Sequence, residues 1–229
     1  MNKSDRFEET INKKIISNFK MAIKKWGEES IQLYPWRYQT DPYSILLSEF
    51  MLHRTQARQV VPIYQNFLRN YPNLETFIQS DKEKIRNDLQ SLGLSWRING
   101  MIEALSKISQ KYGQVPLDFD ELCSIHGIGQ YIAGATICFS QNQPFTLIDT
   151  NVVRVVGRVF GINLKGEARR KNSMVQAISA VVDSDEPRDF YYALIDMAHT
   201  ICHIRKPTCN NCPLQNIPCH YYKHESSCL

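Results

Sequence analysis

The sequence predicts an all-α fold, and three observations lead to this prediction. Apolar residues recur at spacings of three and four along residues 15–26, 60–71, 101–112 and 131–139, which is the period of a helix with a buried face. Alternation of apolar and polar residues, which would indicate strands, is scarce. Clusters of Pro, Gly, Asp and Asn separate the periodic segments, as they do where helices end. We therefore expect about ten short helices joined by tight turns.

The expected helices follow one another between these turns. The first, IISNFKMAIKKW at 15–26, precedes a turn at 34–43, and ILLSEFML at 45–52 indicates a nearly apolar, buried helix. Further turns are expected at 70–75, 112–120, 140–146 and 183–189. Asp149 stands directly before the helical run that starts at TNVV, which is the usual position of an N-cap. Neither a long repeat nor a low-complexity linker interrupts this pattern.

Composition and charge limit the classes of protein to consider. The chain has 229 residues, 43% of them hydrophobic, enough for one large core or two modest ones. Lys and Arg number 27 against 23 Asp and Glu, a formal charge of +4, which permits a polyanionic partner without requiring one. No stretch approaches the roughly 18 unbroken apolar residues of a membrane span, and the N-terminus has no signal-type apolar region. We expect a cytoplasmic protein with no membrane partner.

Four of the seven cysteines cluster near the end of the chain, with the spacing C-x6-C-x2-C-x6-C. They are Cys202, Cys209, Cys212 and Cys219. In a reducing compartment such a cluster indicates metal binding rather than disulfides. A zinc ribbon needs two separated C-x2-C pairs, whereas four unevenly spaced thiolates can bind the corners of an iron–sulfur cluster; zinc and chance clustering stay as alternatives. Arg205 and Lys206 inside this loop are candidates to contact phosphate, unless they are simply solvated charges.

A second informative stretch is LCSIHGIGQYIAGATICF at 122–139. Gly127 and Gly129 separate an apolar turn from an apolar helix that begins near Gln130, which predicts a hairpin between two helices. Glycine lets backbone N–H groups approach a phosphate oxygen, and the following helix N-terminus adds partial positive charge. By itself a G-x-G pattern is most often only a tight turn. Phosphate binding here is therefore a hypothesis that depends on the rest of the chain.

Five motifs occur in one order along the chain and together carry a family resemblance. They are YPWRYQTDPYSILLSEFMLHRTQ, LGLSWR, IHGIGQYIAGA, LIDTNVVRVVGRVFG and the cysteine loop. This order closely resembles the helix-hairpin-helix DNA glycosylases of the endonuclease III superfamily. The resemblance runs from about Tyr34 over nearly the whole remaining chain, and the ordered set is far more specific than any one motif.

The resemblance implies a fold, a cofactor and a partner. The fold would have two lobes: a six-helix barrel at 41–144, and an iron–sulfur cluster lobe built from 1–40 together with 145–229. The cysteines would hold a 4Fe-4S cluster, although Pro218 lengthens the last spacing beyond the usual five residues, so Cys228 stays open as an alternative to Cys219. The protein would act as a monomer on double-stranded DNA, with a monovalent cation at the hairpin.

The same resemblance assigns chemistry to three residues. Asp149 matches the catalytic aspartate that stabilises positive charge on the sugar after the nucleotide is flipped out of the duplex; it also suits a plain N-cap role. Glu49 lies in a nearly apolar helix, where burial would raise its pKa toward that of a general acid for the departing base. Tyr131 stands where bifunctional members carry the lysine nucleophile. A phenol cannot form an imine, so we expect water to attack and the strand to stay intact.

The base that is removed is harder to predict. PWR and GIGQY resemble the adenine glycosylases of the MutY type, but His53 and Arg54 replace a Gln pair, and Leu94 with Ser95 replaces a Tyr pair. These features, with RDFYYALIDMAH before the cysteines, look more like the mismatch glycosylases that excise thymine or uracil opposite guanine. We expect Leu94, His53 and Arg54 to fill the gap left by the flipped nucleotide.

Two further expectations complete the sequence-based interpretation. Arg154 and Arg158 form a basic face that could contact DNA phosphates. Adenine excision opposite guanine or 8-oxoguanine is the alternative activity, and a non-catalytic iron–sulfur DNA-binding protein is the lesser alternative. The buried pair of carboxylates, Glu49 and Asp149, argues against a protein that only binds, because such a protein has no use for them.

Overall fold

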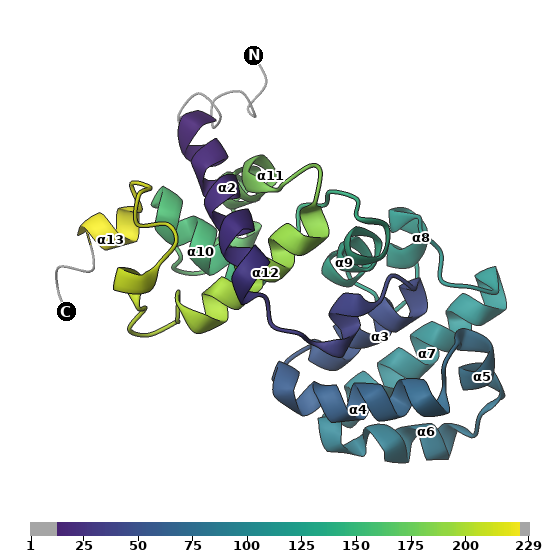
Figure 1. The fold of residues 1–229 in the computed structure, drawn as a ribbon. Helices are drawn as coiled ribbons and strands as arrows, with labels where there is room; N and C mark the ends of the chain where they lie inside the picture. The colour runs from purple at the N-terminus through teal and green to yellow at the C-terminus, as the bar shows by residue number, and fades with distance from the viewer. Residues whose placement is uncertain (1–12, 225–229) are drawn as a thin grey trace. The chain divides into compact units, whose positions relative to one another are not determined.

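A computed structural model describes residues 13–224, and all regular structure in that range is helical. The chain divides into two compact units (Figure 1). The split unit comprises Met1–Gln32 and Asn142–Leu229, and the central unit comprises Leu33–Gln141. No helix within 13–224 is long and apolar enough to cross a membrane.

The central unit surrounds one buried helix. Its elements are η1 (Pro35–Tyr38), α3 (Pro42–Leu52), α4 (Ala57–Asn70), α5 (Leu74–Gln79), α6 (Lys82–Leu89), η2 (Gln90–Leu92), α7 (Ser95–Tyr112), α8 (Phe119–Cys123) and α9 (Gln130–Gln141). Every residue of α3 from Tyr43 to Met51 is buried, which agrees with the nearly apolar sequence. Asp41 caps α3 by accepting the N–H of Ser44 at 2.8 Å, and Pro42 occupies the first turn, where its missing N–H does no harm. Helices α4, α7 and α9 pack around α3.

The split unit is built from segments at both ends of the chain. Its elements are α2 (Lys13–Ser30), α10 (Thr150–Phe160), η3 (Ala168–Arg170), α11 (Asn172–Val181), α12 (Pro187–Thr200), η4 (Cys209–Asn211) and α13 (His220–His224). Helix α2 crosses α12 closely (Figure 1). A Cβ on Gly27 of α2 would lie 2.7 Å from Cβ of Ala193 on α12, so this crossing requires glycine. Phe19 fills the centre, with Phe160 and Phe190 against it at ring distances of 5.7 and 6.3 Å.

The units join at different residues from the expected 40/41 and 144/145. Trp36 in η1 is 3% exposed and packs edge-on against Tyr64 of α4, with ring centroids 5.6 Å apart. This contact places η1 in the central unit. At the second junction the Asn142 side chain donates to the carbonyl of Asp185 and accepts the N–H of Arg188. Residue 142 therefore belongs with the split unit, although it directly follows α9.

Candidate functional site

Asp149 is the N-cap of α10 in the split unit. Its Oδ1 accepts the N–H of Asn151 at 2.6 Å and the N–H of Val152 at 3.3 Å. Within 13–224, Oδ2 accepts no hydrogen bond, and the side chain is half-buried. The capping role foreseen for this position is therefore present, and it uses only one of the two carboxylate oxygens. The second oxygen is available for another interaction.

A buried tyrosine fixes the extended segment that leads to Asp149. The hydroxyl of Tyr191, on α12, donates to the carbonyl of Phe145 at 2.6 Å and accepts the N–H of Leu147 at 2.9 Å. Tyr191 is fully buried, and Leu147 is buried beside it. Because both bonds precede Asp149 by only a few residues, they limit where the carboxylate can lie. Sequence reasoning noticed this tyrosine only as part of RDFYYALIDMAH and gave it no role.

Glu49 and Tyr131 lie on two helices of the central unit that pack against each other. Glu49 is 7% exposed and sits on α3, surrounded in sequence by buried apolar residues. Tyr131 is the second residue of α9 and is half-buried, and α9 packs on α3. The burial of Glu49 agrees with the expectation from the apolar sequence around it. Asp149, by contrast, belongs to the split unit.

The glycine hairpin connects α8 to α9, as the sequence predicts. Gly127 has φ +95°, a conformation that favours glycine. The turn is fastened by Ile128, which is buried and donates its N–H to the carbonyl of Ile125 at 3.0 Å. Gly127 and Gly129 are exposed, and among the described residues their N–H groups donate to no backbone carbonyl. The N–H groups at this turn lie directly before the N-terminus of α9, where an anion is favoured.

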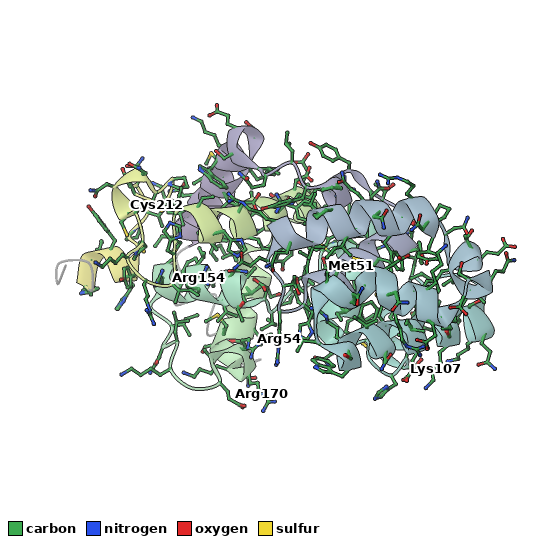
Figure 2. The ribbon with its side chains drawn as sticks, turned by 90° about the horizontal axis from the view of Figure 1, so that it is seen from below. Met51, Arg54, Lys107, Arg154, Arg170 and Cys212 are labelled. Atoms are coloured by element: carbon green, nitrogen blue, oxygen red, sulfur yellow. The ribbon has the colours of Figure 1, made fainter. Side chains whose placement is uncertain are left out.

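Two other loops of the central unit meet at Arg97. Its side chain is 4% exposed. Nη1 donates to the carbonyl of His53 and, at 2.9 Å, to Oγ1 of Thr55, while Nη2 donates to the carbonyl of Leu92 at 2.8 Å. The first loop carries Arg54 after Met51 at the end of α3 (Figure 2), and the second carries Leu94. The arginine was missed at the sequence level because two of its three acceptors are 42 and 44 residues distant.

The exposed side chains of these loops include aromatic and basic groups. Leu94 is 43% exposed and Trp96 is 57% exposed. The ring of His53 meets Trp96 edge-on, with centroids 6.2 Å apart. Partial burial lowers the pKa of His53, and the positive charges of Arg54 and Arg97 lower it further. The lowered pKa favours the neutral form of His53. The exposed surface of these loops therefore presents the cation of Arg54, the aliphatic side chain of Leu94 and the flat ring of Trp96.

The four clustered cysteines lie within electrostatic range of one another in the split unit. All four are free thiols. Burial raises the pKa of the Cys212 thiol to about 11, and the neighbouring cysteines act in the same direction. Among residues 13–224 no three His, Cys, Asp or Glu side chains are grouped so that they could hold a metal ion. The thiols are thus gathered, but not into the tight tetrahedron of a zinc site. Cys228 lies outside the described residues.

Arg154 and Arg158 of α10, expected to contact DNA phosphates, hold the start of the cysteine loop. Arg154 donates from Nε to the carbonyl of Cys202 at 2.9 Å and from Nη2 to that of Ala198 at 2.9 Å. Arg158 donates to the carbonyls of His203 and Ile204 at 2.6 and 2.9 Å and to Sγ of Cys202 at 3.3 Å. Figure 2 shows Arg154 on α10 and Cys212 in the loop. Both arginines use several of their donors here because a loop with little secondary structure offers many unpaired carbonyls.

The other two basic residues proposed for phosphate contact differ from this pair. Arg205 and Lys206 are exposed at the tip of the same loop, and Lys206 has φ +49°. No hydrogen bond or ion pair involving either side chain is found within the described chain. They remain candidates for an external anion.

Comparisons with known proteins agree with this geometry. A family described as HhH-GPD superfamily base excision DNA repair protein matches residues 47–178. Thymine-DNA glycosylase of Aeropyrum pernix is 35% identical over 83% of this chain and 87% of that relative. Thymine/uracil-DNA glycosylase of Pyrobaculum aerophilum is 34% identical over 90% of this chain and 93% of the relative. An adenine DNA glycosylase of Buchnera aphidicola is 32% identical over 80% of this chain but covers 52% of that protein.

Solved structures give the same fold. A thermostable thymine-DNA glycosylase superposes with a TM-score of 0.82 and 30% identity, over 92% of this chain and 97% of that one. A trapped covalent endonuclease III–DNA intermediate superposes with a TM-score of 0.77 at 20% identity, which speaks for the fold alone. The chain therefore belongs to the HhH-GPD superfamily of base excision DNA repair proteins, as a DNA N-glycosylase.

Proposed function

We propose that this enzyme removes thymine or uracil mispaired with guanine from duplex DNA and leaves the strand intact. The observation that carries the proposal is the identity of 31–35% to three thymine- or thymine/uracil-DNA glycosylases over at least 86% of each relative. Adenine excision is the second candidate, because adenine glycosylases reach 30–32% identity. The sequence around His53, Arg54 and Leu94 favours the first.

Cleavage of the N-glycosidic bond would use two carboxylates, Asp149 and Glu49, and a water molecule as the nucleophile. The C1′–N bond breaks with its electron pair leaving on the base, and water then adds to C1′ and gives up a proton. Asp149 would stabilise the positive charge that develops on the sugar, through the carboxylate oxygen that the cap does not use. Glu49, buried on α3, would hydrogen-bond or protonate the departing base. Tyr131 supplies no amine, so no imine to the sugar would form at this position.

DNA binding would use backbone and side-chain donors of both units. The amides of Gly127 and Gly129, with Gln130 at the start of α9, would hold one phosphate, directly or through a monovalent cation. Arg205 and Lys206 would contact further phosphates. Because such contacts displace counterions, affinity should fall steeply as salt rises, and an affinity that stays flat between low and high salt would contradict this arrangement.

The cysteine loop would carry a 4Fe-4S cluster held by the four clustered cysteines. The fit rests on the donor set, since thiolates alone are what such clusters require, and on the donation from Arg158 to Sγ of Cys202. When bound, the cluster supplies four covalent ties within the loop and a one-electron redox centre. The loop residues themselves would then present Arg205 and Lys206. A brown protein that absorbs broadly near 400 nm supports iron–sulfur, and a colourless zinc-containing one contradicts it.

The test of base identity is incubation with duplexes that contain G·T, G·U, G·A or 8-oxoguanine·A, followed by alkali. We expect strand breaks after alkali with G·T and G·U only. Breaks confined to G·A and 8-oxoguanine·A would support adenine excision instead. No break with any duplex, despite tight binding, would support the non-catalytic alternative.

A second experiment tests the water mechanism. The wild type should neither cut the strand without alkali nor be trapped on DNA by borohydride. Tyr131→Lys restores an amine at this position and should add both properties, because a lysine there can form an imine with the sugar. Borohydride trapping of the wild type would overturn the proposal that water is the nucleophile.

The proposal also covers location and assembly. An enzyme acting on chromosomal DNA would work in the cytoplasm, on the nucleoid if the cell is prokaryotic, and as a monomer. Light scattering after gel filtration tests the monomer, and a mass of twice 26.6 kDa would contradict it.

A further inference from the structure

The two loops that carry Arg54 and Leu94 are joined by one side chain. Arg97 lies in the first turn of α7 and donates to the carbonyls of His53 and Leu92 and to Oγ1 of Thr55. A planar guanidinium can serve three acceptors from two loops at once, because its donors point in fixed directions. Arg97 therefore links the loop after α3 to the loop before α7 through hydrogen bonds.

Both loops also hold an uncommon backbone conformation. Arg54 has φ +62° and Leu94 has φ +57°, in the left-handed region that disfavours residues with a Cβ. Gly93 precedes Leu94 with φ +67°. Such conformations persist only where surrounding contacts over-determine them, and they gather at functional sites. Arg97 donates to the carbonyl of the residue directly before Arg54 and to the carbonyl two residues before Leu94.

Arg97 is also a buried cation without a carboxylate partner among the described residues. Its described hydrogen-bond acceptors are two carbonyls and a hydroxyl, and no carboxylate lies within ion-pair distance of it in the described chain. Burying a guanidinium without a counter-ion costs free energy, and a neutral side chain could fill the same space without that cost. Arg97 is itself buried, so its role is to hold the two loops rather than to contact the DNA.

We propose that Arg97 is a positioning residue that sets the two loops before DNA arrives, so that Leu94 and Arg54 enter the duplex together. This inference rests on the proposed function, because it assumes that these loops fill the gap left by a flipped nucleotide. Arg97 itself touches neither the base nor the sugar. Its contribution is the preorganised spacing of the two loops, which lowers the entropy lost when the mismatch is engaged.

The test compares Arg97→Met with a matched control, Arg86→Met. Arg86 is a half-exposed arginine of the same unit that also bonds to α7, through Oδ1 of Asn99 at 3.0 Å. Two quantities are measured: single-turnover excision from G·U duplex, and the ratio of the Kd for matched duplex to the Kd for a G·abasic-site-analogue duplex. Circular dichroism checks the fold.

We expect Arg97→Met to lower both excision and the affinity ratio by about 100-fold, as loss of loop positioning does, while affinity for matched duplex stays near that of the wild type. Arg86→Met should behave as the wild type. Arg97→Lys keeps the charge but not the fork and should still lose about 10-fold. A merely structural role would weaken both duplexes equally and leave the ratio unchanged, which would overturn the inference.

Thr55→Val covers the possibility that Arg97→Met does not fold. It removes one acceptor of Arg97 and leaves the guanidinium on two carbonyls, so a several-fold fall in the affinity ratio is expected and an unchanged ratio contradicts the inference. Failure of the proposed function looks different: the wild type would then excise neither uracil nor thymine. If the wild type is active but Arg97→Met and Arg86→Met have the same affinity ratio, the positioning role of Arg97 is refuted while the proposed function stands.

Discussion

The central and the split unit each hold an irregular loop region that is fastened by arginines, but in different settings. In the central unit, Arg97 connects two short loops whose flanking helices are packed into a core around α3. In the split unit, Arg154 and Arg158 connect α10 to a loop that contributes few buried side chains, chiefly Leu214 and Ile217. The first region is preorganised by the packed helices on either side of it together with the hydrogen bonds of Arg97. The second depends on hydrogen bonds and on what its cysteines bind, because it has too little apolar surface of its own.

The largest expected effect tests whether the split unit supplies chemistry as well as shape. Asp149→Asn removes the carboxylate charge but keeps a good N-cap residue. Excision should fall by about 10²–10³-fold, the range for loss of one transition-state electrostatic contact, while the melting temperature and mismatch affinity stay near wild type. Single-turnover kinetics and thermal melts measure this. Full activity in the variant would leave Asp149 as a cap only and Glu49 as the sole candidate carboxylate.

The next effect tests the dependence of the cysteine loop on α10. Arg158→Met removes the donors to the carbonyls of His203 and Ile204 and to Sγ of Cys202. Buried or half-buried acceptors left unpaired should destabilise the split unit by about 1–3 kcal/mol. Calorimetry measures the change, and loss of visible absorbance on heating reports the loop itself. Arg169→Met, an exposed residue of the same unit, is the control; equal stability of both variants would contradict the assignment.

A pair of glycine substitutions should have opposite signs in the two units. Gly27→Ala places a Cβ 2.7 Å from Cβ of Ala193, so α2 and α12 must separate, at a cost of about 1–3 kcal/mol. In the central unit, Gly100 lies inside α7, and a Cβ there would meet nothing within 4 Å. Gly100→Ala should therefore stabilise the protein by about 0.5–1 kcal/mol. Urea unfolding measures both, and a stable Gly27→Ala variant would show that the helix crossing is not tight.

The smallest expected effect concerns pH and the central unit. Burial and the charges of Arg54 and Arg97 lower the pKa of His53 in the folded state. The unfolded state then binds the proton more readily, so His53 lowers stability as pH falls through its ordinary value of about 6.5. Since the side chain is largely exposed, the change should be small. Melting temperatures at about pH 7.5 and about pH 5.5, wild type against His53→Gln, measure it; a steeper pH dependence in the variant would reverse the sign.

Local signals in the sequence determined the helical fold class, the turns, the capping position of Asp149 and the hairpin at Gly127. These features depend on residues only a few positions apart, which is why periodicity and turn chemistry predict them. The burial of Glu49 followed from the apolar residues around it. The ordered motifs, rather than any single one, gave the family, which the relatives confirm.

Only the tertiary structure decided which distant groups meet. Arg97 bonds to residues 42 to 44 positions away, and Tyr191 holds the segment before Asp149 across 44 to 46 positions. Arg154 and Arg158, which the sequence suggests as a phosphate-binding face, donate to carbonyls 44 to 48 positions away. An arginine that is free at the surface and one that donates to backbone carbonyls have the same local sequence pattern. The difference arises because unpaired backbone carbonyls must find donors wherever the fold brings them, and the sequence does not state where that is.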